Sequence, residues 1–267
     1  DATSFQAKDG ELGLRVYTSR LLGENERLVL VGGGNTSVKL TEKNILGEEA
    51  ELLYVKGSGW GLSDIEAPGF AGVRMDHCLS LLELPELSDA SMVNELKLHR
   101  TLHSAPTPSV ETLLHACLPF KYVDHTHADA VVTLTNLSDG ESRVREIYGD
   151  RVLYVPYVMP GYELAKHCSD LWKRDGRDDL LGMVLLNHGI FSWGKDARES
   201  YERMISLVSL AEEYLTAKGH ERFSSPVPET VPFIESTNDP AELATIRKEI
   251  SDAAGFPLLL RSNLSER

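Results

Sequence analysis

Long hydrophobic runs are absent from this chain of 267 residues. No apolar stretch approaches the roughly 20 residues that a membrane-spanning helix needs. The N-terminus also lacks the basic and then apolar segment of a secretory signal. We therefore expect no membrane partner. The chain begins at Asp1 without a methionine, so we expect either a trimmed end or a piece of a longer protein.

Cysteine and positive charge are both in short supply. The three cysteines, Cys78, Cys117 and Cys168, lie far apart and match no metal-binding spacing. They predict reduced thiols in a cytoplasmic protein, not a disulfide framework. The net charge is −14, with a pI of about 5.1, and lysine and arginine form no cluster. This balance argues against nucleic acid as a partner, whereas a small anionic substrate stays open if a local site supplies donors.

Hydrophobic residues make up 42% of the chain, which is enough for a large core. Short strand-like runs alternate irregularly with helical periods, which predicts one α/β or α+β domain with helices on a mainly antiparallel sheet. Strands are expected at 28–31, 38–40, 51–55, 70–75, 120–127, 151–157, 182–186 and 190–193. Helices are expected at 10–22, after 75 through 84, and at 91–102, 109–118, 128–134, 140–148, 161–173, 197–218 and 241–254.

A proline-rich stretch precedes the last expected helix. Residues 224–240 hold four prolines and show little periodicity, which predicts an extended arm. We expect residues 1–267 to form a single domain. Its core would lie at about 10–220, and a C-terminal arm and helix would occupy 221–267.

The residues from Tyr122 to Asp129 contain the most informative motif, His125-Thr126-His127. In a strand, alternation places His125 and His127 on the same face, about 7 Å apart at the backbone. Two such imidazoles can converge on one zinc ion. The alternative is two unrelated histidines at a strand end.

A third histidine occupies a similar position in the chain. His188 follows an apolar strand-like run and directly precedes Gly189. Together with His125 and His127 it would complete a three-histidine site with an open position, which is the form of a catalytic metal site. Such a site can polarise a carbonyl and stabilise a developing oxyanion. Alone, His188 could equally be a structural histidine.

Glu111 is the candidate acid. It is expected in the first turn of a helix that Ser109 is well placed to cap. A carboxylate there can simply complement the helix dipole. The alternative roles are a general base or a fourth metal ligand that substrate displaces. His115, one turn further on, is expected to be structural.

Two glycine-rich turns supply candidate phosphate donors. Residues 32–37 are expected between two strands, and residues 56–61 likewise lack a following helix, so neither matches a dinucleotide fingerprint or a P-loop. Both offer backbone N–H groups and small hydroxyls, and Lys56 adds a cation. Each turn alone could be an ordinary turn. Together with Ser109 they form three donor-rich corners that could converge on one phosphate.

These motifs occur in an order that resembles the class II aldolase/adducin family. The chain carries Gly34-Asn35-x-Ser37, Lys56-Gly57-Ser58-Gly59, Pro108-Ser109-Val110-Glu111, His125-x-His127 and Asn187-His188-Gly189. The resemblance spans about residues 10–220, and the ordered set is specific although each piece is not. The motifs look most like one branch, the aldolase portion of bifunctional rhamnulose-1-phosphate aldolase/lactaldehyde dehydrogenases.

The resemblance implies a three-layer αβα domain, a homotetramer with zinc sites near subunit interfaces, and a role in carbohydrate metabolism. The family's aldolases are lyases that cleave a ketose 1-phosphate to dihydroxyacetone phosphate and an aldehyde. By the same resemblance, His125, His127 and His188 would bind zinc or another divalent metal, which would hold the substrate oxygens. Glu111 would shuttle the proton. The residues expected to hold the phosphate are Asn35, Ser37, Lys56, Ser58, Gly59 and Ser109.

Two departures from the family pattern limit the inference. Fuculose-phosphate aldolases carry a second serine where this chain has Val110, so one phosphate donor is missing or replaced by Lys56. No dehydrogenase half with a dinucleotide fingerprint is present in the sequence. The chain is therefore expected to be either a stand-alone paralogue or a fragment of a bifunctional protein.

Other functions stay open, among them the hydrolase or decarboxylase activity of some relatives. A pentulose-phosphate 4-epimerase would share the fold and the retro-aldol chemistry, but the family's epimerases typically have aspartate at the position of Glu111. A non-catalytic, adducin-like interaction module would keep the fold and lose the metal ligands. All three histidines and the acid are present, so the resemblance favours the aldolase.

Overall fold

A single sheet of seven strands forms the centre of the structure, a computed structural model that describes residues 1–30, 33–219, 239–255 and 257. The strands are β1 (Asn35–Lys43), β2 (Glu49–Lys56), β3 (Phe70–Arg74), β4 (Tyr122–Thr126), β5 (Val152–Val155), β6 (Gly182–Leu185) and β7 (Gly189–Gly194). Their order is β3-β2-β1-β4-β7-β6-β5. All neighbouring pairs are antiparallel except β5 with β6. The predicted, mainly antiparallel sheet is confirmed.

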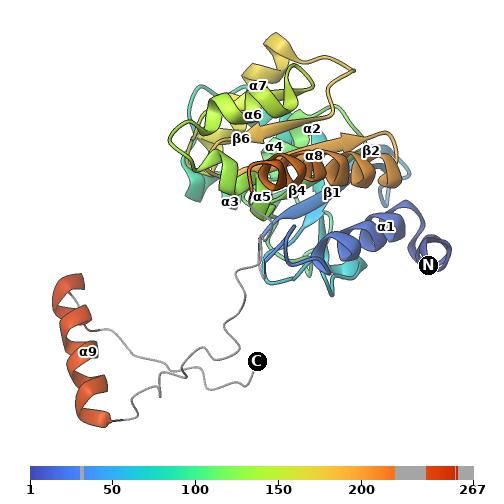
Figure 1. Cartoon of the computed structure of the whole chain (residues 1–267). Helices are drawn as coiled ribbons and strands as arrows, with labels where there is room; N and C mark the ends of the chain where they lie inside the picture. The colour runs from blue at the N-terminus through green and yellow to red at the C-terminus, as the bar shows by residue number, and fades with distance from the viewer. Residues whose placement is uncertain (31–32, 220–238, 256, 258–267) are drawn as a thin grey trace. The chain divides into compact units, whose positions relative to one another are not determined.

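Helices cover both faces of this sheet (Figure 1). They are α1 (Ala2–Gly23), α2 (Met75–Leu82), α3 (Asp89–Leu98), α4 (Thr112–Cys117), α5 (Asp129–Thr135), α6 (Gly140–Tyr148), α7 (Tyr162–Asp175) and α8 (Ala197–Ala217). Helices α1 and α8 pack on β1, β4 and β7, whereas α2 and α4 pack on β2 and join α7. The three-layer αβα architecture expected from the sequence is confirmed.

Successive side chains of β4 point to opposite faces of the sheet. Val123 belongs to the large apolar core beneath α2, α4 and α7, and Tyr122 packs toward α1 with Val38. Asp124 shares the α1 face and forms a fully buried ion pair with Arg15, at 2.5 Å. His125 therefore shares the face of Val123, toward α4.

One predicted strand, at 28–31, is wrong. Leu28 and Val29 are buried, but they lie in a turn in which both amides donate to the carbonyl of Asn25. Val31 lies outside the described residues. The apolar run is buried without joining the sheet, which periodicity alone cannot reveal. Helix α1 also begins earlier than expected, with a kink at Asp9–Gly10.

The C-terminal part of the chain, Arg222–Arg267, is a separate compact unit from Asp1–Glu221. It contains α9 (Pro240–Ala254), which confirms the last predicted helix and has no buried residue. The predicted extended arm falls almost entirely outside the described residues. The single domain expected over 1–267 stays a prediction. Within the described chain, no helix is both long and apolar enough to cross a membrane.

Candidate metal centre

Four strand ends meet at one end of the sheet. β1 runs antiparallel to β4 and places Asn35 opposite His125. On the other side, β7 is also antiparallel to β4 and places Phe191 opposite His125. Because β2 is antiparallel to β1, its last residue, Lys56, reaches the same end. Segments far apart in the sequence therefore surround the end of β4.

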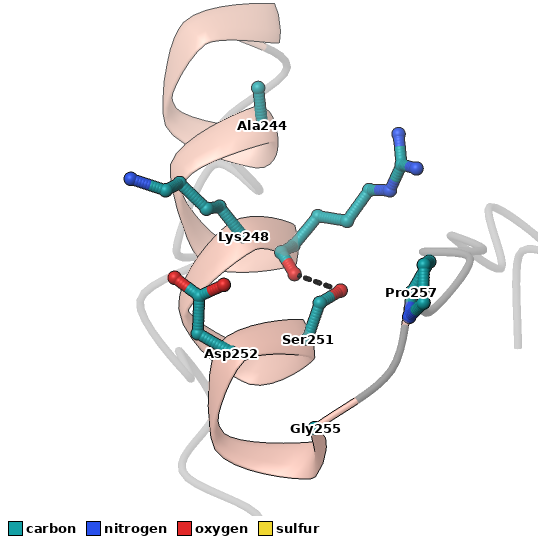
Figure 2. Close-up of a pocket in the computed structure, with 7 residues that line it drawn as sticks. Ala244, Lys248, Ser251, Asp252, Gly255 and Pro257 are labelled. Carbon is teal, nitrogen blue, oxygen red and sulfur yellow. Dashed lines mark hydrogen bonds between the residues drawn. The ribbon is translucent and has the colours of Figure 1, made fainter.

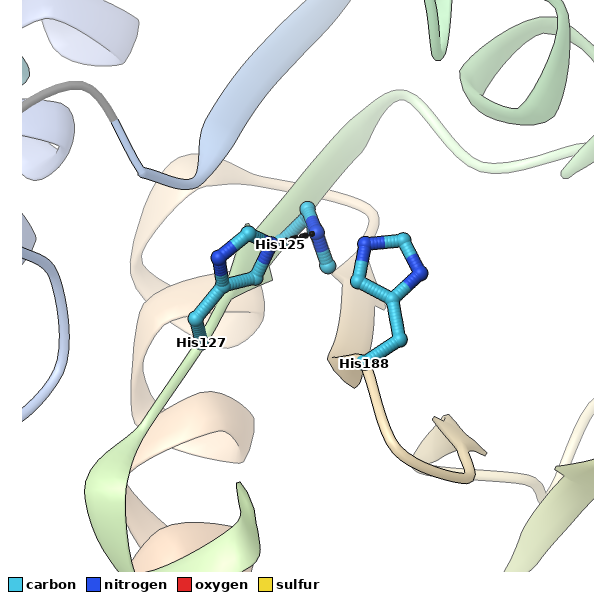
Figure 3. A group of neighbouring side chains, drawn as sticks. All are labelled: His125, His127 and His188. Atoms are coloured by element: carbon cyan, nitrogen blue, oxygen red, sulfur yellow. Dashed lines mark hydrogen bonds between the residues drawn. The ribbon is translucent and has the colours of Figure 1, made fainter. Parts of the chain in front are cut away.

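Three histidines gather at this strand end (Figure 3). One nitrogen from each of His125, His127 and His188 lies within 4.8 Å of the other two. His125 belongs to β4, which ends at Thr126. His127 therefore follows the strand, although the sequence predicted that it would lie within it. The rings of the pair still approach each other, with 2.9 Å between their Nε2 atoms. The predicted grouping of the three histidines is confirmed.

A tight turn between β6 and β7 supplies His188. Asn187 adopts φ 58°, a left-handed conformation that asparagine tolerates better than most residues. Its side chain donates to the carbonyl of Thr135 at 3.2 Å, which ties the turn to α5. Gly189 has no room for a side chain, since a Cβ would lie 2.5 Å from the carbonyl oxygen of Thr126. The turn therefore accounts for Asn187 and Gly189, the residues on either side of His188.

The histidines have the chemistry of metal ligands. The Nδ1–H of His125 donates to the carbonyl of Ile190 at 3.1 Å, which leaves the Nε2 lone pair facing the other histidines. The ring also stacks on Phe191, with centroids 4.1 Å apart. Burial lowers the pKa of His125, His127 and His188, so all three are held neutral, as a metal requires.

Glu111 lies beside two of these histidines. Its Oε2 is 3.4 Å from His125 Nε2, and its Oε1 is 3.3 Å from His188 Nε2. The residue occupies the N-cap position of α4, because the helix begins at Thr112 and not at Ser109. The hydroxyl of Ser109 instead accepts the Glu111 amide at 3.2 Å. Ser109 is therefore not the N-cap that the sequence predicted, but its hydroxyl still orients the backbone of Glu111.

Two buried polar atoms of this group lack a hydrogen-bond partner among the described residues. They are Glu111 Oε1 and His188 Nδ1. Burial raises the pKa of Glu111, while His188 and then the Asn35 hydrogen bond oppose the shift. An unsatisfied carboxylate oxygen beside three neutral imidazoles fits a divalent cation, which would supply the missing positive charge.

A buried chain of hydrogen bonds connects Glu111 to the sheet. Asn35 donates one N–H to Glu111 Oε2 at 2.6 Å and the other to Ser109 Oγ at 3.2 Å. Its Oδ1 accepts from His115 Nε2, and His115 Nδ1 in turn accepts from Ser37 at 2.8 Å. Burial lowers the pKa of His115 far enough to keep it neutral with one N–H. Sequence reasoning named His115 structural but missed that it orients Asn35.

These hydrogen bonds change the roles expected for Ser37 and Asn35. Ser37 is fully buried with its hydroxyl on His115, so the structure does not bring it to a phosphate. Both N–H groups of Asn35 point to protein atoms, and a phosphate contact would have to release one of them. The Gly-Asn-Thr-Ser motif therefore contributes to the metal centre mainly through Asn35, which supports Glu111.

A cavity of about 450 Å³ opens beside Glu111 and His127. Most of the predicted phosphate donors line it, and Lys56 does so with a side chain whose pKa is lowered by burial. Among the described residues, the Lys56 ammonium forms no ion pair or hydrogen bond. The lining residues are Gly34, Asn35, Lys56, Gly57, Ser58, Gly59, Trp60, Gly61, Ser109, Val110, Glu111 and His127.

Backbone amides contribute less to this cavity than expected. The Gly57 amide donates to the carbonyl of Gly69, and the Ser58 amide to that of Thr107, both at 2.8 Å. Neither amide is therefore available to an anion. Gly59 adopts φ +90°, which explains glycine at this position. The side chains of Lys56, Ser58 and Ser109 are the stronger donors.

A second hollow lies along α9, in the C-terminal unit (Figure 2). It has a volume of about 560 Å³ and is lined by one helix and the residues directly after it. Ser251 donates to the carbonyl of Arg247 at 2.7 Å within the helix. Its lining contains neither histidine nor cysteine, so we assign the chemistry to the first cavity, beside the histidines.

The fold and this site define a class II aldolase-type protein with a centre suited to a divalent metal. The chain belongs to the class II aldolase and adducin N-terminal domain family, whose model matches residues 14–215.

Its relatives agree with this assignment. A protein of Bacillus subtilis (strain 168) named uncharacterized oxidoreductase YuxG is 38% identical over 221 residues, which is 80% of this chain and 32% of the relative. The chain thus spans about a third of that relative's length. The N-terminal class II aldolase domain of a conserved protein from Thermoplasma acidophilum is 41% identical, with a TM-score of 0.73 over 78% of this chain and 94% of that one.

More distant structures share the fold. A sugar-phosphate aldolase from Thermotoga maritima is 17% identical, with a TM-score of 0.56 over 79% of this chain and 97% of that one.

Proposed function

We propose that the chain is a zinc-dependent class II aldolase that cleaves a deoxyketose 1-phosphate, such as rhamnulose 1-phosphate, to dihydroxyacetone phosphate and an aldehyde. The observation that carries the proposal is the position of Glu111. Its carboxylate lies against His125 and His188 and at the same time lines the cavity that holds the candidate phosphate donors. The proposed proton carrier, metal site and anion site thus adjoin one another.

His125, His127 and His188 would hold the metal, for which zinc is the natural choice because three neutral imidazoles and an open position form a catalytic zinc set. When bound, the cation would polarise the substrate carbonyl and stabilise the negative charge that develops as the carbon–carbon bond breaks.

Glu111 would carry the proton that this reaction needs. Retro-aldol cleavage between C3 and C4 releases a proton from the C4 hydroxyl and leaves a carbanion at C3 that must be protonated. The burial that raises the pKa of Glu111 suits a group that accepts and returns a proton. Asn35 holds Glu111 Oε2 by a hydrogen bond. Glu111 Oε1 has no hydrogen-bond partner among the described residues, and we propose that this oxygen exchanges the proton with the substrate.

The phosphate would lie among Lys56, Ser58, Gly59 and Ser109. Lys56 brings a cation to the cavity wall, and the two serines bring hydroxyl donors. Val110 is half exposed at the same wall, where the resemblance to fuculose-phosphate aldolases predicts a serine. We propose that Lys56 compensates for the missing hydroxyl.

The chain corresponds, in this proposal, to the aldolase portion of a bifunctional rhamnulose-1-phosphate aldolase/lactaldehyde dehydrogenase. The match to about a third of YuxG supports this placement. Any redox chemistry implied by that relative's name would then belong to the two thirds that this chain does not match. We further propose a homotetramer, which light scattering on the purified chain would test.

The decisive experiment is release of dihydroxyacetone phosphate from a panel of ketose 1-phosphates by the zinc-loaded chain, with chelator-treated protein as the control. We expect zinc-dependent release from a 6-deoxyketose 1-phosphate. Interconversion of pentulose phosphates without release would identify an epimerase instead. A chain that takes up no divalent metal at the three histidines would contradict both enzymes and favour an adducin-like module.

A further inference from the structure

A second cluster of metal-ligating side chains lies at the opposite end of β3 from the cavity. Lys56 pairs with Phe70 at the start of β3, whereas the strand ends at Arg74. The cluster begins just after that end. It consists of His77 in α2, Glu95 in α3 and His99 directly after α3.

The three side chains are already close together. The ligand atoms that they offer lie within 4.8 Å of one another. His77 Nε2 is 3.0 Å from Glu95 Oε2, and His99 Nδ1 is 3.7 Å from the same oxygen. The two imidazole rings stack with centroids 3.3 Å apart and planes inclined by 13°. Ring nitrogens of both histidines are thereby brought to one carboxylate.

The backbone around His99 holds the cluster in place. His99 caps the end of α3, where its amide donates to the carbonyl of Glu95 at 3.1 Å. Its own carbonyl accepts the amide of Arg74 at 3.1 Å, and Thr101 donates to Gly72 at 2.9 Å. The segment after α3 thus adds to the edge of β3. The Nδ1–H of His99 also donates to the carbonyl of Glu95 at 2.9 Å, so Nε2 is the nitrogen of this ring that remains for an ion.

The cluster is also open to solvent. The side chains of His77, Glu95 and His99 are 23%, 32% and 32% exposed. An ion can reach them without passing through the catalytic cavity, and the net charge of −14 favours a cation.

We propose that His77, Glu95 and His99 bind a first-row divalent transition metal of the Zn²⁺ class. Two imidazole nitrogens and one carboxylate oxygen are a ligand set that zinc uses with a fourth position for water. Two nitrogen ligands disfavour Mg²⁺ and Ca²⁺, which prefer oxygen. The ion would tie α2 to the end of α3 and to the segment that lengthens the edge of β3. This site is independent of the proposed aldolase activity.

Metal stoichiometry of the full chain tests the proposal. Chelator-stripped protein is loaded with Zn²⁺, desalted and assayed for bound zinc, with circular dichroism to confirm that each variant is folded. We expect two equivalents in the wild type and one in His77→Ala/His99→Ala. The matched control is His103→Ala, which removes an exposed histidine four residues beyond His99 and should keep two equivalents. Retention of two equivalents by the double variant would overturn the proposal.

A variant that lacks one histidine of the first site separates the two sites. His188→Ala should still bind one equivalent of Zn²⁺, and excess Mg²⁺ or Ca²⁺ should not displace it. Zinc at about 100-fold over its Kd should raise the unfolding midpoint of this variant by about 5 °C. Adding Glu95→Gln or His77→Gln, which keep the size and polarity of these positions, should abolish both the binding and the shift. A stoichiometry of zero in His188→Ala would contradict the second site, whatever the chain's activity.

Discussion

The two histidine–glutamate clusters use the same side chains in opposite settings. In the first, His125 is fully buried and Glu111 is 7% exposed, and the carboxylate keeps an oxygen without a hydrogen-bond partner in the described chain. In the second, His77 and Glu95 are partly exposed and satisfy each other at 3.0 Å. Burial beside a cavity suits the first group to the proposed proton transfer, whereas the partly exposed second cluster is proposed only to bind an ion. The setting, more than the residue types, distinguishes them.

The largest expected effect concerns Glu111. The Glu111→Gln variant keeps the size and the hydrogen bond to Asn35 but removes the proton carrier. Turnover should fall by about 10²- to 10⁴-fold, while bound zinc stays at the wild-type level. Release of dihydroxyacetone phosphate and metal analysis would measure the two quantities. Full activity in this variant would remove Glu111 from the catalytic role.

Glu163 offers a matched control for Glu111. It is an exposed acid in the first turn of α7, where it can complement the helix dipole and nothing more. Glu163→Gln should leave turnover within twofold of the wild type. Equal losses in both variants would indicate that Glu111 acts only through its helix.

The next effect concerns the strand that carries His125. Asp124→Asn leaves the Arg15 charge buried without its full partner on the back of β4. Breaking a buried pair in this way costs about 3–5 kcal/mol of unfolding free energy. Urea unfolding would measure it. The control is Asp170→Asn, in the exposed pair with Lys166, which should cost about 0–1 kcal/mol; equal costs would contradict the assigned importance of burial.

A smaller effect is expected at the turn beside His188. In Gly189→Ala the new Cβ would lie 2.5 Å from the Thr126 carbonyl and 3.0 Å from ring atoms of His125 and His127. The backbone must shift, at a cost of about 1–3 kcal/mol. Zinc affinity should fall at the first site alone. Zinc titration of the variant combined with His77→Ala would measure this loss, and unchanged affinity would show that the turn tolerates the methyl group.

The smallest effect is expected at the second cluster without metal. With chelator present, His77→Ala should change the unfolding free energy by at most about 0.5–1 kcal/mol, because the side chain is partly exposed and loses one hydrogen bond. Chemical unfolding would measure this free energy with and without Zn²⁺. We expect the variant to differ clearly from the wild type only when the metal is present. A loss above about 2 kcal/mol in the metal-free chain would mean that the cluster already stabilises the fold without an ion.

Much of the site could be predicted because its motifs are short and local. Alternation placed His125 on one face of a strand, and the apolar run before His188 placed it at another strand end. The C-terminal end of β4 was predicted one residue too late, since His127 lies just past it. The predicted anion nest was weakened for a different reason. The amides of Gly57 and Ser58 donate to Gly69 and Thr107, and these partners come from segments that a turn motif does not include.

The sequence by itself determined most of the strands and helices, though not all of their ends, and the order of motifs that identifies the family. Both are properties of neighbouring residues and their periods. Only the tertiary structure decided that Asn35 supports Glu111 across 76 positions and that His77 meets Glu95 across 18. It also decided that Leu28 and Val29 are buried outside the sheet. Such contacts depend on the order of strands and the packing of helices, which local patterns leave open.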